Sequence, residues 1–66
     1  MNDEMIRQYI QDILVMADDA KREPEGAFRD GKLLAYNEVL STLKTDLTPL
    51  GVERYGLDFD IDKKYA

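Results

Sequence analysis

The stretch from Phe28 to Leu47 constrains the fold of this 66-residue chain more than any other. When its residues are spaced about 100° apart, as in an α-helix, the apolar ones gather on one broad face. That face contains Phe28, Ala35, Tyr36, Val39, Leu40, Leu43 and Leu47, and the opposite side carries Asp30, Asn37, Glu38, Ser41 and Thr45. A face of this width is unstable in water, so the rest of the chain must cover it.

A second amphipathic helix is predicted near the start of the sequence. Asn2 is a favourable N-cap, and the two acidic residues after it lie where the helix dipole favours negative charge. Val15 points away from the apolar face of this helix, and Pro24 disfavours helical backbone at the residue before it. The helix therefore ends near Lys21 or Arg22. Its apolar face contains Ile6, Tyr9, Ile10, Ile13, Met16, Ala17 and Ala20.

The connection between the two helices is short, which implies antiparallel neighbours in an αα-hairpin. Acidic residues also precede basic ones by four positions, a spacing that supports helices, at Asp3/Arg7, Asp18/Arg22 and Glu25/Arg29. We therefore predict a single all-α domain over residues 1–66, with helices at about 3–21 and 25–47 and an extended tail at 49–66.

The tail has a different periodicity from the helices. Tyr55, Leu57, Phe59 and Ile61 alternate with mainly acidic or small residues. Period two is typical of an extended segment with one apolar and one polar edge. A lone strand leaves its backbone unpaired, so we expect the tail to lie along the hairpin or to pair with the tail of a second chain. The sequence leaves these two arrangements open.

The size of the chain favours self-association. At 66 residues a single core is barely sufficient, and the absence of cysteine rules out a disulfide. Because both helical stripes are wider than one partner helix can cover, we expect a homodimer packed as a four-helix bundle. The pattern does not distinguish a parallel from an antiparallel arrangement of the two copies.

Composition also argues against several functions. A net charge of −5 is unfavourable for nucleic acid binding, which relies on neutralised phosphates. Neither a signal-like leader nor an apolar run of about 18 residues is evident, so we expect a cytoplasmic protein without membrane contact. With no histidine or cysteine, and Ser41 without an activating base, we predict no catalytic residue, no cofactor and no enzyme activity.

The acidic row Asp58-x-Asp60-x-Asp62 resembles the start of a calcium loop. An EF-hand needs glycine at its sixth position and glutamate at its twelfth, whereas the sixth position here is Lys63. We therefore predict no metal site and interpret the row as a solvated acidic edge.

Five residues are candidates for contact with a partner: Lys32, Leu34, Asp58, Asp60 and Asp62. Lys32 lies near the centre of an apolar face, where it either snorkels to water or meets a partner's carboxylate. Leu34 projects from the side opposite the apolar face. Gly31 is costly inside a helix, so it indicates a close helix crossing, a slight irregularity near the loop, or a notch in which a partner approaches the backbone.

The run from Gly31 to Leu43, Gly-Lys-Leu-Leu-Ala-Tyr-Asn-Glu-Val-Leu-Ser-Thr-Leu, together with Gly56-Leu-Asp-Phe-Asp-Ile-Asp-Lys, carries a resemblance. It is similar to short uncharacterised helical proteins of Gram-positive bacteria and their mobile elements. In that group a Gly-x-Leu-x-Ala-Tyr-x-Glu-Val-Leu helix precedes an acidic Gly-Leu-Asp tail. The resemblance implies no activity and assigns no functional residues. The hairpin also resembles the Rop-type dimer in layout, but without a basic face for RNA.

Together these features predict a small non-enzymatic interaction or regulatory protein that acts through self-association and protein–protein contact. The alternative is an acidic inhibitor or nucleic-acid mimic that occupies a basic groove of another protein. A purely structural subunit of a larger assembly is the third hypothesis.

Overall fold

A computed structural model describes residues 2–66 and contains two long helices followed by three short ones. The long helices are α1 (Asp3–Lys21) and α2 (Ala27–Leu47). Two 3₁₀-helices, η1 (Thr48–Leu50) and η2 (Val52–Tyr55), lead to the short helix α3 (Ile61–Tyr65). The all-α prediction is confirmed, since residues 2–66 contain no strand. No helix in this range combines the length and hydrophobicity needed to cross a membrane.

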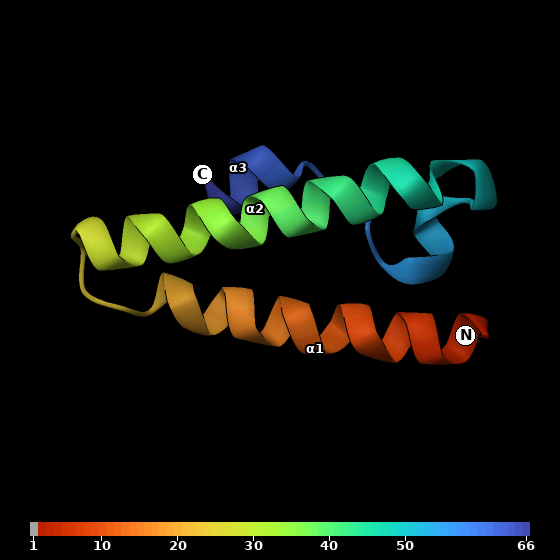
Figure 1. The fold of residues 1–66 in the computed structure, drawn as a ribbon, viewed down its shortest axis with the longest axis horizontal. Helices are drawn as coiled ribbons and strands as arrows, with labels where there is room; N and C mark the ends of the chain where they lie inside the picture. The colour runs from red at the N-terminus through yellow and green to blue at the C-terminus, as the bar shows by residue number, and fades with distance from the viewer. Residues whose placement is uncertain (1) are drawn as a thin grey trace.

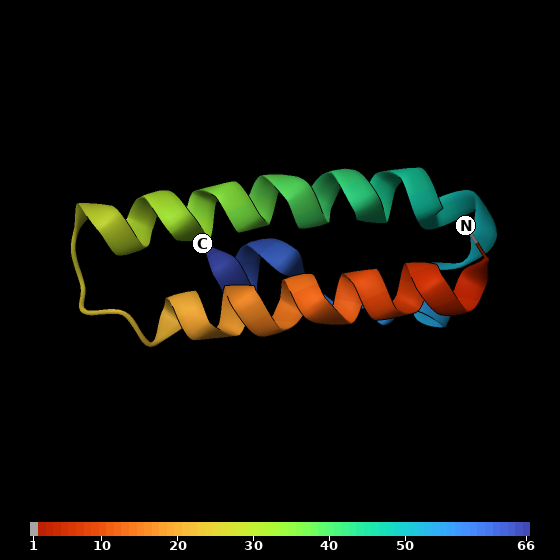
Figure 2. The ribbon, with the colours of Figure 1, turned by 60° about the horizontal axis from the view of Figure 1, so that its bottom comes forward.

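The two long helices lie side by side and run in opposite directions (Figure 1). After α2 the chain turns back and places α3 against one side of this pair. In Figure 2, α3 appears between the two long helices and behind them. The pair therefore has one side covered by its own tail and one side turned away from it.

The ends of α1 follow from local chemistry. The Asn2 side chain accepts a hydrogen bond from the Met5 amide at 2.8 Å and so satisfies one of the free donors of the first turn. Acidic residues occupy the first turn and Lys21 the last, as the helix dipole favours. The next helix begins later than predicted, at Ala27 and not near residue 25. Its N-cap is Gly26 at φ 154°, a backbone conformation that L side chains rarely adopt.

The core lies between α1, α2 and the tail. α1 contributes Ile10, Ile13, Ala17 and Ala20, and α2 contributes Leu33, Leu40 and Leu47. The tail adds Tyr55, Leu57, Ile61 and Tyr65, two of which are the largest fully buried side chains of the protein. The expectation that the tail packs along its own helices therefore describes this structure.

The prediction of an extended tail is wrong. Residues 49–50, 52–55 and 61–65 are helical, and the longest irregular stretch of the tail is residues 56–60. Gly56 ends η2 in the left-handed conformation at φ 76°, where glycine meets no steric penalty. The Asp60 carboxylate then caps α3 by accepting a hydrogen bond from the Lys63 amide at 3.2 Å. Alternating apolar residues therefore reach the core through turns and caps, with Phe59 only half-buried.

Gly31 shows no close helix crossing. A Cβ atom built on it meets no atom within 4 Å, so the glycine costs helix stability without relieving a clash inside this chain.

We predict that Gly31→Ala stabilises the protein by about 0.5–1 kcal/mol, because alanine restricts the unfolded chain and favours helix. Urea unfolding followed by circular dichroism measures this change. Gly51→Ala is the control and should destabilise, because Gly51 has φ 93° and its new Cβ would lie 2.8 Å from a Glu53 carboxylate oxygen. Destabilisation by Gly31→Ala would instead indicate that a second molecule approaches the backbone there.

A second prediction compares two leucines of α2. Leu40 is fully buried, whereas Leu34 is 61% exposed, as the helical phase predicted. We expect Leu40→Ala to cost about 2–5 kcal/mol, since it removes buried contacts and leaves a cavity. Leu34→Ala should change the free energy of unfolding by less than about 0.5 kcal/mol. Equal losses in the two variants would contradict this assignment of the core.

Candidate functional site

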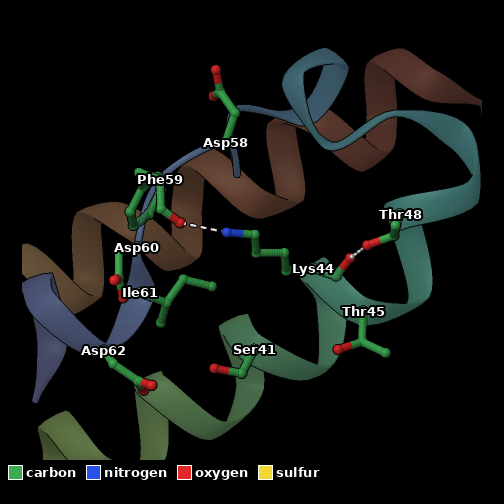
Figure 3. A pocket seen from close by; sticks show the side chains of 9 residues that line it. All are labelled: Ser41, Lys44, Thr45, Thr48, Asp58, Phe59, Asp60, Ile61 and Asp62. Carbon is green, nitrogen blue, oxygen red and sulfur yellow. Dashed lines mark hydrogen bonds between the residues drawn. The ribbon is translucent and has the colours of Figure 1, made fainter.

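The predicted acidic row lines a polar hollow between α2 and the segment that precedes α3 (Figure 3). Its volume is about 550 Å³. It is lined by Ser41, Lys44, Thr45, Thr48, Asp58, Phe59, Asp60, Ile61 and Asp62. Asp58, Asp60 and Asp62, which were expected to contact a partner, thus share one hollow.

Most polar groups of this hollow already have partners within the chain. The Lys44 ammonium donates to the Phe59 carbonyl at 2.6 Å and ties the tail to α2. The Thr48 hydroxyl donates to the Lys44 carbonyl at 2.7 Å, and the Ser41 hydroxyl donates to the Asn37 side chain at 3.2 Å. The first bond fixes the tail and the other two lie along α2, so the polar hollow is mainly a structural feature.

The three aspartates do not form a common acidic edge. Asp60 caps α3, and Asp62 accepts a hydrogen bond from the Asn37 amide at 2.9 Å. Asp58 lines the hollow, but its carboxylate points away from Lys44 (Figure 3). Among residues 2–66, no group of three or more acidic side chains lies close enough together to hold a metal ion.

A second hollow, here called the α2–α3 hollow, lies nearer the end of the tail and has a volume of about 420 Å³. It is lined by Asp30, Leu33, Leu34, Asn37, Asp62, Tyr65 and Ala66. Two predicted contact residues, Leu34 and Asp62, therefore meet here although they are distant in the sequence. This juxtaposition could not be read from the sequence, because it depends on where α3 packs.

Lys32 belongs to neither hollow. Its ammonium lies 3.0 Å from a Glu23 carboxylate oxygen and 4.7 Å from the centre of the Phe28 ring. The carboxylate that the sequence led us to expect from a partner is thus supplied by the loop between α1 and α2. The five predicted contact residues fall into three separate places.

The long helices also present apolar side chains to water, and the hollow that α1 and α2 share there includes no residue of the tail. We call this surface the open face and define it by Met5, Tyr9, Met16, Phe28 and Val39, all of which are exposed. Tyr9 on α1 and Val39 on α2 line the same shallow hollow with Leu43, so the two helices contribute to one surface. The spacing supports this grouping. On α1, intervals of four and seven residues separate Met5, Tyr9 and Met16, and the same intervals separate Phe28, Lys32 and Val39 on α2.

The sequence pattern placed Tyr9, Met16, Phe28 and Val39 on the apolar faces and led to the expectation that a second copy covers them, but it did not include Met5. Tyr9 is 59% exposed and Val39 is 46% exposed. The signal was the width of the two stripes, which exceeds what a single neighbouring helix covers. The tail covers only the other side of the helix pair.

Two buried tyrosines fasten the tail to α1. The Tyr55 hydroxyl donates to Asp3 at 2.9 Å, and the Tyr65 hydroxyl donates to Asp18 at 2.7 Å. Asp3 also pairs with Arg54, and Asp18 pairs with Lys64 at 3.7 Å. Both acids therefore bind the tail and not the basic residues four positions later, Arg7 and Arg22. Of the three predicted pairs at that spacing, only Glu25/Arg29 forms, at 3.8 Å.

The environment of both phenols raises their pKa above the usual value. For Tyr65 the main cause is burial, followed by the hydrogen bond to Asp18. For Tyr55 the main cause is the hydrogen bond to Asp3, followed by burial. In each case a phenolate would be poorly hydrated and would face a carboxylate, so the neutral hydroxyl is favoured.

Comparison with known proteins does not narrow the function. No family model matches the chain, and neither a search of curated proteins nor one of solved structures finds a match. The functional argument therefore depends on the exposed surfaces of this chain.

The tyrosine contacts predict a loss of stability in alkali. The unfolded phenols release protons near pH 10, whereas the folded ones keep them because their pKa is raised. The stabilisation is therefore complete below about pH 10 and decreases as the pH rises above it. We expect the free energy of unfolding to fall less steeply above about pH 10 in Tyr65→Phe than in the parent protein, as measured by urea unfolding.

The matched control is Tyr9→Phe, measured at a concentration where the chain is monomeric, because Tyr9 is then 59% exposed. This variant should keep the parent's pH dependence. An unchanged alkaline slope in Tyr65→Phe would contradict the assignment of the buried phenols.

Proposed function

We propose that this chain is a small non-enzymatic interaction protein that works as a homodimer, in which the open faces of two copies pack into a four-helix bundle. The observation that supports the proposal most is the grouping of exposed apolar side chains on one side of α1 and α2. Monomeric soluble proteins rarely expose a contiguous apolar patch of this kind without a binding role.

Charge favours a second copy as the occupant. The chain carries a net charge of −5, so two copies repel each other over most of their surfaces. The residues that define the open face are uncharged, and Lys32 beside them pairs with Glu23. Glu38 is the one charged residue among those that line the hollow between Tyr9 and Val39. Two copies that meet through the open face therefore bring few like charges together.

The dimensions also suit a dimer. The Cα trace measures 37 × 18 × 14 Å, and one long side of such a shape is large enough for a specific interface. One such side from each copy gives a total interface area of roughly 1,000–1,300 Å², which is where the range for stable protein–protein interfaces begins. The heptad-like spacing on both helices is the spacing that four-helix bundles use for interhelical packing.

The proposal includes contact with a further protein on the tail side of the helix pair and a cytoplasmic location. The acidic-mimic alternative would require a continuous negative surface. It is less favoured, because Asp60 and Asp62 are engaged in internal hydrogen bonds and Asp58 points elsewhere.

Val39→Asp tests the dimer by placing a carboxylate in the proposed interface of both copies. Burying this charge without a partner is costly, and two such charges would also repel each other. We expect the parent protein to scatter light at twice the chain mass of 7.6 kDa at micromolar concentration. In the variant we expect the dissociation constant to rise by at least about 100-fold, which gives the monomer mass.

Val15→Asp is the control, because it makes the same change at a 59% exposed valine outside the open face. It should leave the mass unchanged. A parent protein that is monomeric at high micromolar concentration, or two variants with the same mass as the parent, would overturn the dimer through this face.

A further inference from the structure

The α2–α3 hollow combines an apolar floor with a negative rim. Leu33 and Tyr65 form buried parts of its lining, and Leu34 stands beside them in water with 61% of its surface exposed. Asp30 from α2 and Asp62 from α3 contribute two carboxylates to the same lining. The hollow exists only because α3 packs against α2.

Neither carboxylate of this hollow has an ion-pair partner among residues 2–66. No lysine or arginine lines the hollow, and neither Asp30 nor Asp62 takes part in an ion pair among residues 2–66. Asp62 is partly engaged, since one of its oxygens accepts from Asn37, whereas Asp30 forms no side-chain hydrogen bond in this range. The hollow thus offers hydrophobic contact and two carboxylates without ion-pair partners at the same place.

We infer that this hollow receives a basic side chain, arginine or lysine, from a protein partner. These side chains carry an aliphatic stem and a cationic head, which match the leucine floor and the carboxylate rim respectively. A neutral apolar side chain would leave the carboxylates unpaired, and a small cation would gain nothing from the leucines. The complementarity therefore selects an amphipathic cation.

This inference deepens the proposed function, because it names the chemistry of the partner in the predicted protein–protein contact. The α2–α3 hollow lies on the tail side of the helix pair, away from the open face. A homodimer through the open face would therefore leave two such hollows accessible. The inference rests on the proposed role in protein contact but not on dimer formation.

The test uses the full chain and the probe N-acetyl-arginine amide. A single side chain binds weakly, on the order of millimolar, so amide chemical shifts in a nitrogen-15 spectrum are the suitable readout. We expect saturable shifts at the amides of Asp30, Leu34, Asn37 and Tyr65. N-acetyl-citrulline amide, which has nearly the same shape but no charge, should produce no saturable shifts.

Two matched variants locate the effect. Asp30→Asn removes one rim carboxylate at an exposed position and should weaken binding of the arginine probe about tenfold. Asp46→Asn makes the same change on the same helix outside the hollow and should leave binding unchanged.

The inference is overturned if citrulline and arginine probes bind alike, if Asp46→Asn weakens binding as much as Asp30→Asn, or if the shifts are spread over all acidic positions. Light scattering on the same samples reports the mass independently. A monomer that still binds the arginine probe would reject the dimer alone, and a dimer that does not bind it would reject this inference alone.

Discussion

The packing of the tail against α1 and α2 is the interaction on which the rest of this structure depends. Two helices alone share a narrow line of contact and cannot enclose a core. Among residues 2–66, the tail provides four of the eleven buried apolar residues, including the large rings of Tyr55 and Tyr65. Its hydroxyls reach Asp3 near one end of α1 and Asp18 near the other. The tail is thus held at two distant points and gives the helix pair a covered and an uncovered side.

Much of the fold could be predicted because helical periodicity is a local property of the sequence. It correctly placed Leu40 in the core and Leu34 in water. The tail was harder, because its residues are buried through turns and not through a regular element. Alternation correctly selected Tyr55, Leu57 and Ile61, but it missed Tyr65, which follows Ile61 by one helical turn. The Asp60 cap was the overlooked signal, since it starts a helix where the alternation suggested a strand.

The candidate surfaces were less predictable, because they depend on which sides of each helix the tail covers. A helical wheel shows that Tyr9 and Val39 are on apolar stripes, but it does not show whether anything packs on them. Likewise, nothing in the sequence brings Leu34 and Asp62 together until α3 docks on α2. Acidic residues misled for a related reason: Asp3, Asp18 and Asp62 looked free for solvent or helical pairs, yet they bind the tail or α2.

One side of the helix pair is covered by the tail of the same chain, whereas the other side is covered only in the proposed dimer. On one side the cover is part of the chain, so its local concentration is fixed by the connection at residues 48–51 and does not depend on dilution. In the proposed dimer the other side is covered by a second molecule, so this part of the stability rises with protein concentration. The covalent cover also creates the α2–α3 hollow, because α3 is one of its walls. Loss of the tail would therefore remove the core anchors and the proposed partner site together, whereas loss of the dimer would leave both in place.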